Sequence, residues 1–346
     1  MNDISLYPCG DGTARAAEMS PSVLTPTAGQ RLLSQSVQKI NNTLVKPRSW
    51  IYDIIHIFEI IRAFRMRYLS FVHNGVSRYG CVVGGDSLCD LGRRTGLPDL
   101  KSHIATYFDS LGKEADLEAD FHLAEVLLQP VMPNPEKVIC VAVNYREGDY
   151  PSPDEPKYPV VFTRFANAQA GHEVPLIKPD VSDKFDYEGE LAVIIGRSGH
   201  RIAETDALGH IAGYTCFNDG SVRDWQKHSS QFTPGKNFLQ TAGFGPWMVS
   251  ADEIPDPSGL DLSTRVNGEL RQSTNTRRMM FSIPWLISYL SQFTKLEPGD
   301  VIVTGTPKGF GSSLQPPRFL QVGDVVEVEI TGIGVLRNTV AAEMRI

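Results

Sequence analysis

Short apolar runs with the alternation typical of β-strands dominate the chain from residue 66 onward. Successive side chains of a strand point to opposite faces, so each run can bury one face of a sheet. The runs lie at residues 68–72, 79–83, 138–143, 160–165, 185–195, 211–217, 301–304, 325–330 and 335–340. Helical spacing predicts helices at residues 97–111, 117–128, 221–228 and 280–293. The pattern therefore predicts an α+β protein that is mostly β.

The same pattern divides the chain into three segments. Residues 1–65 are rich in Ser, Thr and Pro at first and end in an amphipathic helix near residues 51–64, so we expect a partly disordered extension. An organelle-targeting role for this extension stays open. Residues 66–132 predict a small N-terminal α+β domain, and residues 133–346 predict the main domain.

Composition excludes several classes of partner. A net charge of −7 without a Lys/Arg block argues against a nucleic-acid partner. No stretch reaches the ~18 apolar residues of a membrane span. The five cysteines include no CxxC pair, which fits a reducing compartment, so we expect a cytoplasmic protein.

Two glutamates, Glu188 and Glu190, stand two residues apart in a predicted strand. Side chains at this spacing share a face, and Gly189 between them leaves the other face bare. Two carboxylates so close repel one another unless a cation, a basic residue or water compensates them. A solvated strand face is the alternative interpretation.

A second predicted strand ends at Asp219, just before a predicted helix that carries Arg223 and Gln226 on roughly one face. Lys236 follows in a Gly/Pro loop. A carboxylate at a strand end, followed by polar donors on one helix face, is an arrangement found in active sites. Asp219 could equally serve as a helix cap.

Five short motifs now add a resemblance. They are Asn144-Tyr145-Arg146, Tyr187-Glu188-Gly189-Glu190-Leu191, Asn218-Asp219 with Arg223-Asp224-Trp225-Gln226, Gly245-Pro246-Trp247 and Thr304-Gly305-Thr306-Pro307. Their order and spacing over residues 137–340 resemble the fumarylacetoacetate hydrolase (FAH) family. Residues 66–132 resemble the family's smaller N-terminal domain only loosely.

The resemblance implies a β-sandwich roll as the catalytic domain and usually a homodimer. It implies Mg²⁺ or Mn²⁺ bound by Glu188, Glu190 and Asp219. It also implies a small keto acid as substrate, bound by Tyr145, Arg223, Gln226, Lys236 and Thr306. Arg164, together with Arg277 and Arg278, is a further candidate for a distal carboxylate.

The implied ligands suit enolate chemistry. A 2-oxo carboxylate chelates a cation through its carboxylate and keto oxygens, and the cation stabilises the enolate that forms when a neighbouring bond breaks. Lys236 can add positive charge where the oxyanion develops, which makes it a catalytic candidate.

The predicted lid at residues 146–159 departs from the family pattern. In hydrolytic relatives a His in the lid pairs with a Glu to deprotonate water, but Gly148 stands at that place here. No His occurs between residues 123 and 171. Glu147 in the lid and His172 beyond it are the candidates to replace this base.

Three functions remain. A metal-dependent hydrolase of a C–C bond in a small diketo acid stands first, because the resemblance favours it. A decarboxylase or tautomerase of an oxaloacetate-type keto acid is the alternative, since it needs no activated water. A catalytically impaired family member that acts as a binding subunit is the third.

Overall fold

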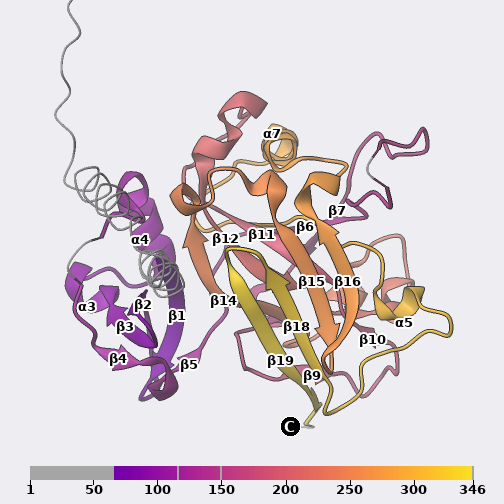
Figure 1. Cartoon of the computed structure of the whole chain (residues 1–346), viewed down its shortest axis with the longest axis horizontal. Helices are drawn as coiled ribbons and strands as arrows, with labels where there is room; N and C mark the ends of the chain where they lie inside the picture. Colours follow the sequence, from indigo (N-terminus) through magenta and orange to yellow (C-terminus); the bar gives the residue numbers. More distant parts are fainter. Residues whose placement is uncertain (1–65, 115–116, 149, 345–346) are drawn as a thin grey trace, which may run out of the picture. The chain divides into compact units, whose positions relative to one another are not determined.

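The computed structural model describes residues 66–114, 117–148 and 150–344, so the extension predicted at residues 1–65 lies outside the described part. Two β-sheets dominate this part of the chain (Figure 1). The larger sheet has twelve strands and the smaller has five. This mostly β architecture with few helices confirms the predicted fold class.

Residues 67–128 form one end of the larger sheet. Its strands here are β1 (Arg67–His73), β2 (Val76–Gly84), β3 (Ser87–Asp90), β4 (Phe121–His122) and β5 (Leu127–Leu128). Two short helices, α3 (Leu91–Thr95) and α4 (Leu100–Tyr107), accompany them. Because β1 also pairs with a strand of the main part, the sheet continues across the predicted boundary near residue 132. The division into two domains there stays a prediction.

The prediction of a helix at residues 117–128 is wrong. The His122 side chain accepts the N–H of Ala124, and the Glu125 side chain accepts the N–H of His122, which closes a single 3₁₀ turn. Leu128 then pairs with Phe71 of β1. The apolar residues of this segment therefore serve strand pairing, and tertiary contacts override the local helical spacing.

The rest of the larger sheet carries the candidate site. Its main strands are β6 (Val138–Ala142), β7 (Val160–Arg164), β11 (Gly189–Ile195), β12 (Ile211–Asn218), β14 (Ala242–Ser250) and β17 (Val301–Val303), with β8 (Gln169–Ala170) beside β14. Four of the predicted strands, at 138–143, 160–165, 211–217 and 301–304, are confirmed to within one residue. β6 and β17 are parallel, so the loops that follow these two strands leave the sheet at the same end of the strands.

The smaller sheet packs face to face on the larger one. Its strands are β9 (Leu176–Lys178), β15 (Asp261–Val266), β16 (Glu269–Asn275), β18 (Val325–Ile330) and β19 (Gly334–Ala342). Leu191 and Val193 of β11 share one apolar core with Leu262 of β15 and Val328 of β18. This pair of facing sheets is the predicted sandwich.

Two predicted helices start later than their apolar spacing suggests. α4 begins after Asp99, whose side chain accepts the N–H of Ser102 at 2.7 Å. α7 (Ile283–Phe293) begins after Ser282, whose side chain accepts the N–H of Trp285 at 3.3 Å. N-cap side chains satisfy the free N–H groups of the first turn, so they fix the start of a helix.

The strand predicted at residues 185–195 is interrupted. β10 (Phe185–Asp186) pairs with β13 (Ser221–Val222), whereas β11 begins only at Gly189. Because β13 takes the first two residues of the helix predicted at 221–228, only α5 (Arg223–Gln226) remains. Both interruptions lie beside the carboxylates of the candidate site.

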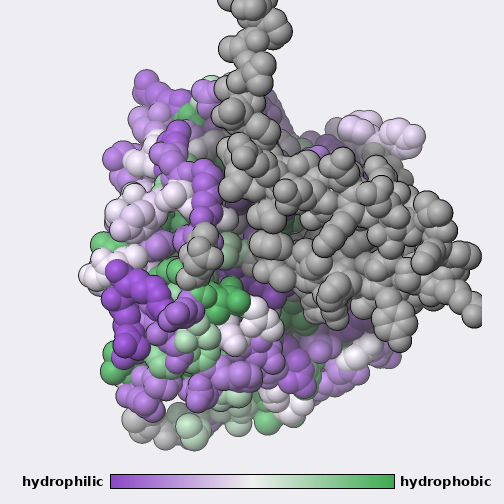
Figure 2. All heavy atoms as spheres, turned by 60° about the vertical axis from the view of Figure 1, so that its left-hand side comes forward, coloured by the Kyte–Doolittle hydropathy of each residue, from purple (hydrophilic) through white to green (hydrophobic). Residues whose placement is uncertain are grey.

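The described part of the face drawn in Figure 2 is mainly polar. On the face in Figure 2, hydrophilic residues predominate and hydrophobic residues form small groups between them. Among the described residues, no helix is both long and apolar enough to cross a membrane.

Candidate active site

Glu188, Glu190 and Asp219 meet where β11 pairs with β12. The two strands are antiparallel, with Gly189 opposite Asn218, so the start of β11 lies beside the end of β12. Each of the three carboxylates is buried, and one oxygen from each lies within 4.8 Å of the others. The N–H of Asp219 also donates to the carbonyl of Glu188 at 2.8 Å, which fixes the two segments together. Sequence reasoning expected these residues to share a site.

Gly189 allows the two sheets to meet directly behind the glutamates. A Cβ at this position would lie 2.0 Å from Oγ1 of Thr264 in β15, so no side chain fits there. The N–H of Gly189 donates to Oε1 of Gln272 in β16 at 2.9 Å. The bare face predicted beside the glutamates is therefore filled by the smaller sheet, which holds both carboxylates in place.

Three buried cations surround the carboxylates. Nζ of Lys236 lies 2.7 Å from Glu188 and 2.6 Å from Asp219. Lys236 ends the short helix α6 (Thr233–Lys236). Nη1 of Arg223 lies 2.6 Å from Glu188. Arg164, at the end of β7, contacts Asp219 and also donates to Gly220 and Thr241, so these groups occupy both of its terminal nitrogens.

The two glutamates have opposite electrostatic environments. Burial alone would raise the pKa of Glu188, but Arg223 and Lys236 outweigh burial and lower this pKa to about 2. Burial and the charges of Asp219 and Glu188 hold the pKa of Glu190 well above its usual range. Among the described residues Glu190 has no ion pair and accepts only the N–H of Gly305. Asp219 and Glu188 also outweigh burial to raise the pKa of Lys236.

This arrangement fits a divalent cation. The three carboxylates offer oxygen ligands only, which hard cations such as Mg²⁺, Mn²⁺ and Ca²⁺ prefer. An ionised Glu190 without a positive partner is costly in a buried place, so the structure itself calls for added positive charge there. Glu188, Glu190 and Asp219 could therefore hold such an ion.

A charge count sharpens this conclusion. We call the charge cluster the following residues: Asp186, Glu188, Glu190, Asp219, Arg164, Arg223 and Lys236. Four carboxylates and three cations give it a formal charge of −1 when all are ionised. A divalent cation would bring the charge to +1. The loaded site would then attract an anionic substrate, which the empty charge cluster would repel.

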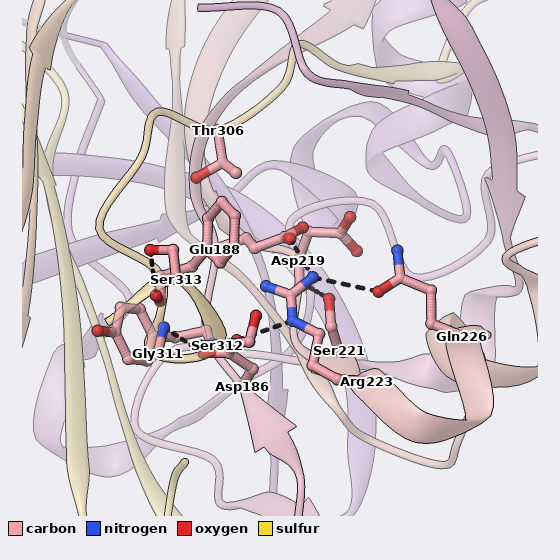
Figure 3. A network of polar contacts seen from close by, with 12 residues as sticks. Asp186, Glu188, Asp219, Ser221, Arg223, Gln226, Thr306, Gly311, Ser312 and Ser313 are labelled. Atoms are coloured by element: carbon pink, nitrogen blue, oxygen red, sulfur yellow. Dashed lines mark hydrogen bonds and ion pairs between the residues drawn. The ribbon is translucent and has the colours of Figure 1, made fainter. Parts of the chain in front are cut away.

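Of the residues predicted to bind substrate, Arg223, Gln226 and Thr306 lie near Glu188 and Asp219 (Figure 3). Oε1 of Gln226 accepts a hydrogen bond from Arg223 at 3.2 Å. The Thr306 hydroxyl donates to the carbonyl of Gly189 at 2.9 Å and accepts from Gln272 at 2.8 Å. The Tyr145 hydroxyl is buried without a hydrogen-bond partner among the described residues, and burial together with Glu190 raises its pKa.

Among the described residues, an exposed ion pair joins the lid to the loop that carries Thr306. Glu147 forms an ion pair with Lys308, two residues after Thr306. Within the lid, Nε of Arg146 lies 2.6 Å from Glu155, and Nη1 of Arg146 donates to the carbonyl of Met279 at 2.7 Å. Arg146 therefore pins the lid to the body of the protein, whereas Glu147 reaches the loop after β17.

His172 makes its contacts elsewhere. Its Nδ1 accepts the N–H of Arg337 in β19 at 3.0 Å, and its ring lies 3.9 Å from Glu173. Burial lowers its pKa. Among the described residues, no recorded contact links His172 to the charge cluster.

Sequence reasoning assigned no role to Asn144 or Asp186. The buried side chain of Asn144 donates to the carbonyls of Thr304 and Phe281 and accepts the N–H of Phe281, so it ties the start of the lid to the loop after β17. Asp186 is buried below Glu188 and contacts Arg223 at 2.7 Å. Its place directly before the Tyr187-Glu188 motif was the available signal.

Known proteins support the assignment of this fold. The family described as fumarylacetoacetate (FAA) hydrolase C-terminal matches residues 137–341. Oxaloacetate tautomerase YisK of Bacillus subtilis is 44% identical over 225 residues, which are 64% of this chain and 75% of that protein. The mitochondrial oxaloacetate tautomerase FAHD2B of Bos taurus is 44% identical over 223 residues, 63% of this chain and 70% of that protein.

Solved structures agree. A fumarylacetoacetate hydrolase from Exiguobacterium antarcticum superposes with a TM-score of 0.73 at 36% identity, covering 80% of this chain and all of that one. A 5-carboxymethyl-2-hydroxymuconate delta-isomerase from Mycobacterium smegmatis superposes with a TM-score of 0.67 at 29% identity, covering 81% and 100%. The family match at residues 137–341 includes the segments that carry the three carboxylates. The chain belongs to the fumarylacetoacetate hydrolase family.

Proposed function

We propose that this chain catalyses the divalent-metal-dependent keto–enol tautomerisation of an oxaloacetate-type keto acid. The observation that carries the proposal is the buried group of three carboxylates, two of which contact Lys236. The relatives named oxaloacetate tautomerase support the reaction and substrate class. This reverses the order expected from the sequence, in which a hydrolase came first.

Glu188, Glu190 and Asp219 would hold the cation, for which we propose Mg²⁺ or Mn²⁺. When bound, such an ion supplies Lewis-acid polarisation of a keto group. The ammonium of Lys236 lies between Glu188 and Asp219, so it adds fixed positive charge where an enolate oxygen would develop. Burial strengthens this interaction because water cannot screen it.

Tautomerisation moves one proton between a carbon and the enol oxygen, and no water is consumed. It therefore needs a proton carrier but not the water-activating His that the lid lacks at Gly148. We propose Lys236 as this carrier, with Glu147 at the start of the lid as the alternative. Glu147 lies on the lid, where its partner Lys308 can release it.

An oxaloacetate-type substrate has a second carboxylate. Nη2 of Arg223 is buried and has no hydrogen-bond partner among the described residues, although Nε and Nη1 are both paired. We propose that Nη2, with the amide of Gln226, receives that carboxylate. A charge-assisted hydrogen bond from Nη2 to that carboxylate would favour dicarboxylic over monocarboxylic keto acids.

Hydrolysis of a diketo acid is the second candidate, and its support is at the level of the family description. Decarboxylation shares the enolate and stays an alternative. The test incubates the purified chain with Mg²⁺, Mn²⁺ or EDTA and follows the loss of the enol's ultraviolet absorbance. CO₂ and the two acids of acylpyruvate hydrolysis are scored in parallel.

We expect metal-dependent enol loss faster than CO₂ release. Metal-dependent formation of two acids without enol loss would replace the tautomerase by the hydrolase. Tight metal binding without any turnover would favour the binding-subunit interpretation.

Oligomeric state and compartment stay predictions from the sequence. We propose a homodimer, which light scattering on the purified chain tests. We propose the cytoplasm as the compartment, whereas the relatives from Bos taurus are named mitochondrial. A fluorescent fusion, with and without residues 1–65, distinguishes the two compartments.

A further inference from the structure

Asp186 is a fully buried carboxylate beside the proposed metal site. Its Oδ1 accepts the N–H groups of Tyr187 at 2.9 Å and Gly311 at 2.7 Å. Its Oδ2 accepts Nε of Arg223 at 2.7 Å and the N–H of Ser312 at 2.9 Å. Four donors from three segments of the chain therefore converge on one side chain, as Figure 3 shows for Gly311, Ser312 and Arg223.

Arg223 carries this contact to the metal site. Nη1 of Arg223 lies 2.6 Å from Oε1 of Glu188, and its Cζ lies 4.7 Å from the centre of the Phe310 ring. The guanidinium is planar and rigid, so fixing Nε at Asp186 also fixes Nη1 at Glu188 and the direction of Nη2. Asp186 and Glu188 thus share one positive charge.

The loop after β17 presses against the same carboxylate. A Cβ on Gly311 would lie 1.9 Å from the carbonyl oxygen of Arg318 and 2.7 Å from Oδ1 of Asp186. Only a residue without a side chain allows this approach. The loop that begins with Thr306 is therefore anchored at its far end by Asp186.

We propose that Asp186 is a positioning residue for the metal and substrate groups of this site. It acts through Arg223 on Glu188, and through Gly311 and Ser312 on the loop that carries Thr306. The inference rests on the proposed function, because it assigns Glu188 to a cation. It adds a residue that contacts neither cation nor substrate but sets the orientation of groups that do.

Asp186 affects cation binding because it shares the positive charge of Arg223 with Glu188. An arginine cannot release its proton, so its charge must be matched by nearby carboxylates. Without Asp186 the whole charge of Arg223 would fall on Glu188 and compete with a cation for the Glu188 oxygens. Outer partners of metal ligands typically change metal affinity by about 10- to 100-fold.

The test is isothermal titration of the full chain with Mn²⁺ for the wild type and Asp186→Asn. An asparagine keeps the shape but loses the charge, and its amide opposes the N–H donors of Ser312 or Gly311. We expect Mn²⁺ to bind about 10- to 100-fold more weakly and the KM for oxaloacetate to rise.

Asp300→Asn is the matched control. Asp300 is equally buried, accepts the N–H groups of Lys137 and Glu297, and pairs with Lys137 at 2.8 Å, but it does not contact the charge cluster. We expect this variant to lose thermal stability while its Mn²⁺ affinity stays unchanged. An equal loss of Mn²⁺ affinity in the control would overturn the inference.

Two further variants keep the test decisive if Asp186→Asn folds poorly. Gly311→Ala should displace the loop from Asp186 and weaken Mn²⁺ binding in the same direction. In the Arg223→Gln background, Asp186→Asn should change Mn²⁺ affinity little, because Asp186 acts on Glu188 through Arg223.

The outcomes are distinct. Additive losses in the double variant, or wild-type affinity in both Asp186→Asn and Gly311→Ala, would overturn the positioning role alone. A wild-type chain that binds no Mn²⁺ would overturn the proposed function, and the positioning role with it.

Discussion

The charge cluster and the lid hold their charged side chains in opposite ways. In the cluster, Lys236 and Asp219 are both nearly inaccessible to solvent. In the lid, the partners Glu147 and Lys308 are 69% and 68% exposed. Removing one partner of a buried pair costs about 3–5 kcal/mol, whereas an exposed pair contributes about 0–1 kcal/mol. The fold therefore fixes the cluster, whereas the exposed Glu147–Lys308 pair at the start of the lid can separate when a substrate binds.

The largest effect should come from Glu190→Gln in the cluster. The amide removes a charged ligand, so we expect Mn²⁺ affinity to fall by more than about 100-fold and enol turnover to fall with it. Titration calorimetry measures the first and the enol assay the second. Unchanged Mn²⁺ affinity would falsify the assignment of the metal ligands.

Although Glu190→Gln should weaken metal binding, it should preserve or raise the thermal stability of the metal-free protein. The pKa of Glu190 is raised in the folded protein, so the contribution of this side chain to folding stability is complete below its pKa in the unfolded chain. That contribution is lost as pH rises through its pKa in the folded protein. Glutamine has no charge to bury at any pH. In EDTA at pH 8 the variant should therefore unfold at the same or a higher temperature than the wild type.

Lys236→Met should separate metal binding from chemistry. Loss of the ammonium should lower kcat by roughly 10²–10³-fold, as when one oxyanion donor is removed. Mn²⁺ should bind as tightly as before or more tightly, because Glu188 and Asp219 lose a competing cation. Lys137→Met, which removes the partner of Asp300, is the control and should leave kcat unchanged. Retained turnover in Lys236→Met would exclude Lys236 as the proton carrier.

A smaller effect is expected in the lid. Glu147→Gln breaks only an exposed ion pair, so kcat/KM should change by less than about fivefold. A loss of about 100-fold or more would instead identify Glu147 as the general acid or base. Lys308→Gln is the matched variant, since it breaks the same pair without touching the carboxylate. Steady-state kinetics on the enol compare the two.

His172→Asn should have the smallest effect, and mainly on stability. Burial lowers the His172 pKa, so the neutral ring stabilises the fold above the pKa of the unfolded chain, and this stabilisation is lost as pH falls through the folded value. Asparagine can still accept the N–H of Arg337 but cannot gain a proton. The drop in melting temperature from pH 7.5 to pH 5 should be smaller in the variant. A large loss of turnover would contradict the placement of His172 away from the chemistry.

The three carboxylates of the cluster were largely visible in the sequence, whereas several of their buried partners were not. Glu188, Glu190 and Asp219 are close in the chain, and strand spacing brings them together even though Glu188 precedes β11. Arg164 contacts Asp219 across 55 residues, and Asp186 receives Gly311 across 125. No local sequence pattern encodes such contacts, so these partners could be identified only from the folded structure.

The fold was predictable to a similar degree. β18, which alternates buried and more exposed residues, and β12, a continuous buried run, both lie within one residue of their predicted places. The failed helix at residues 117–128 has apolar residues at helical spacing, but they pack on β1. The spacing of apolar residues alone cannot distinguish a helix from a segment that pairs with a strand some 50 residues away.

The position of β17 has a consequence for the order of folding during synthesis. This strand lies between β6 and β11 in the sheet, yet it is made more than 100 residues after either. The N–H of Gly305, which donates to Glu190, follows this strand after one further residue. A nascent chain that has reached Asp219 already contains all three carboxylates, but the sheet that orders them is still open. Pairing across such distances is slow to form, so the metal site should close only as one of the last steps of folding.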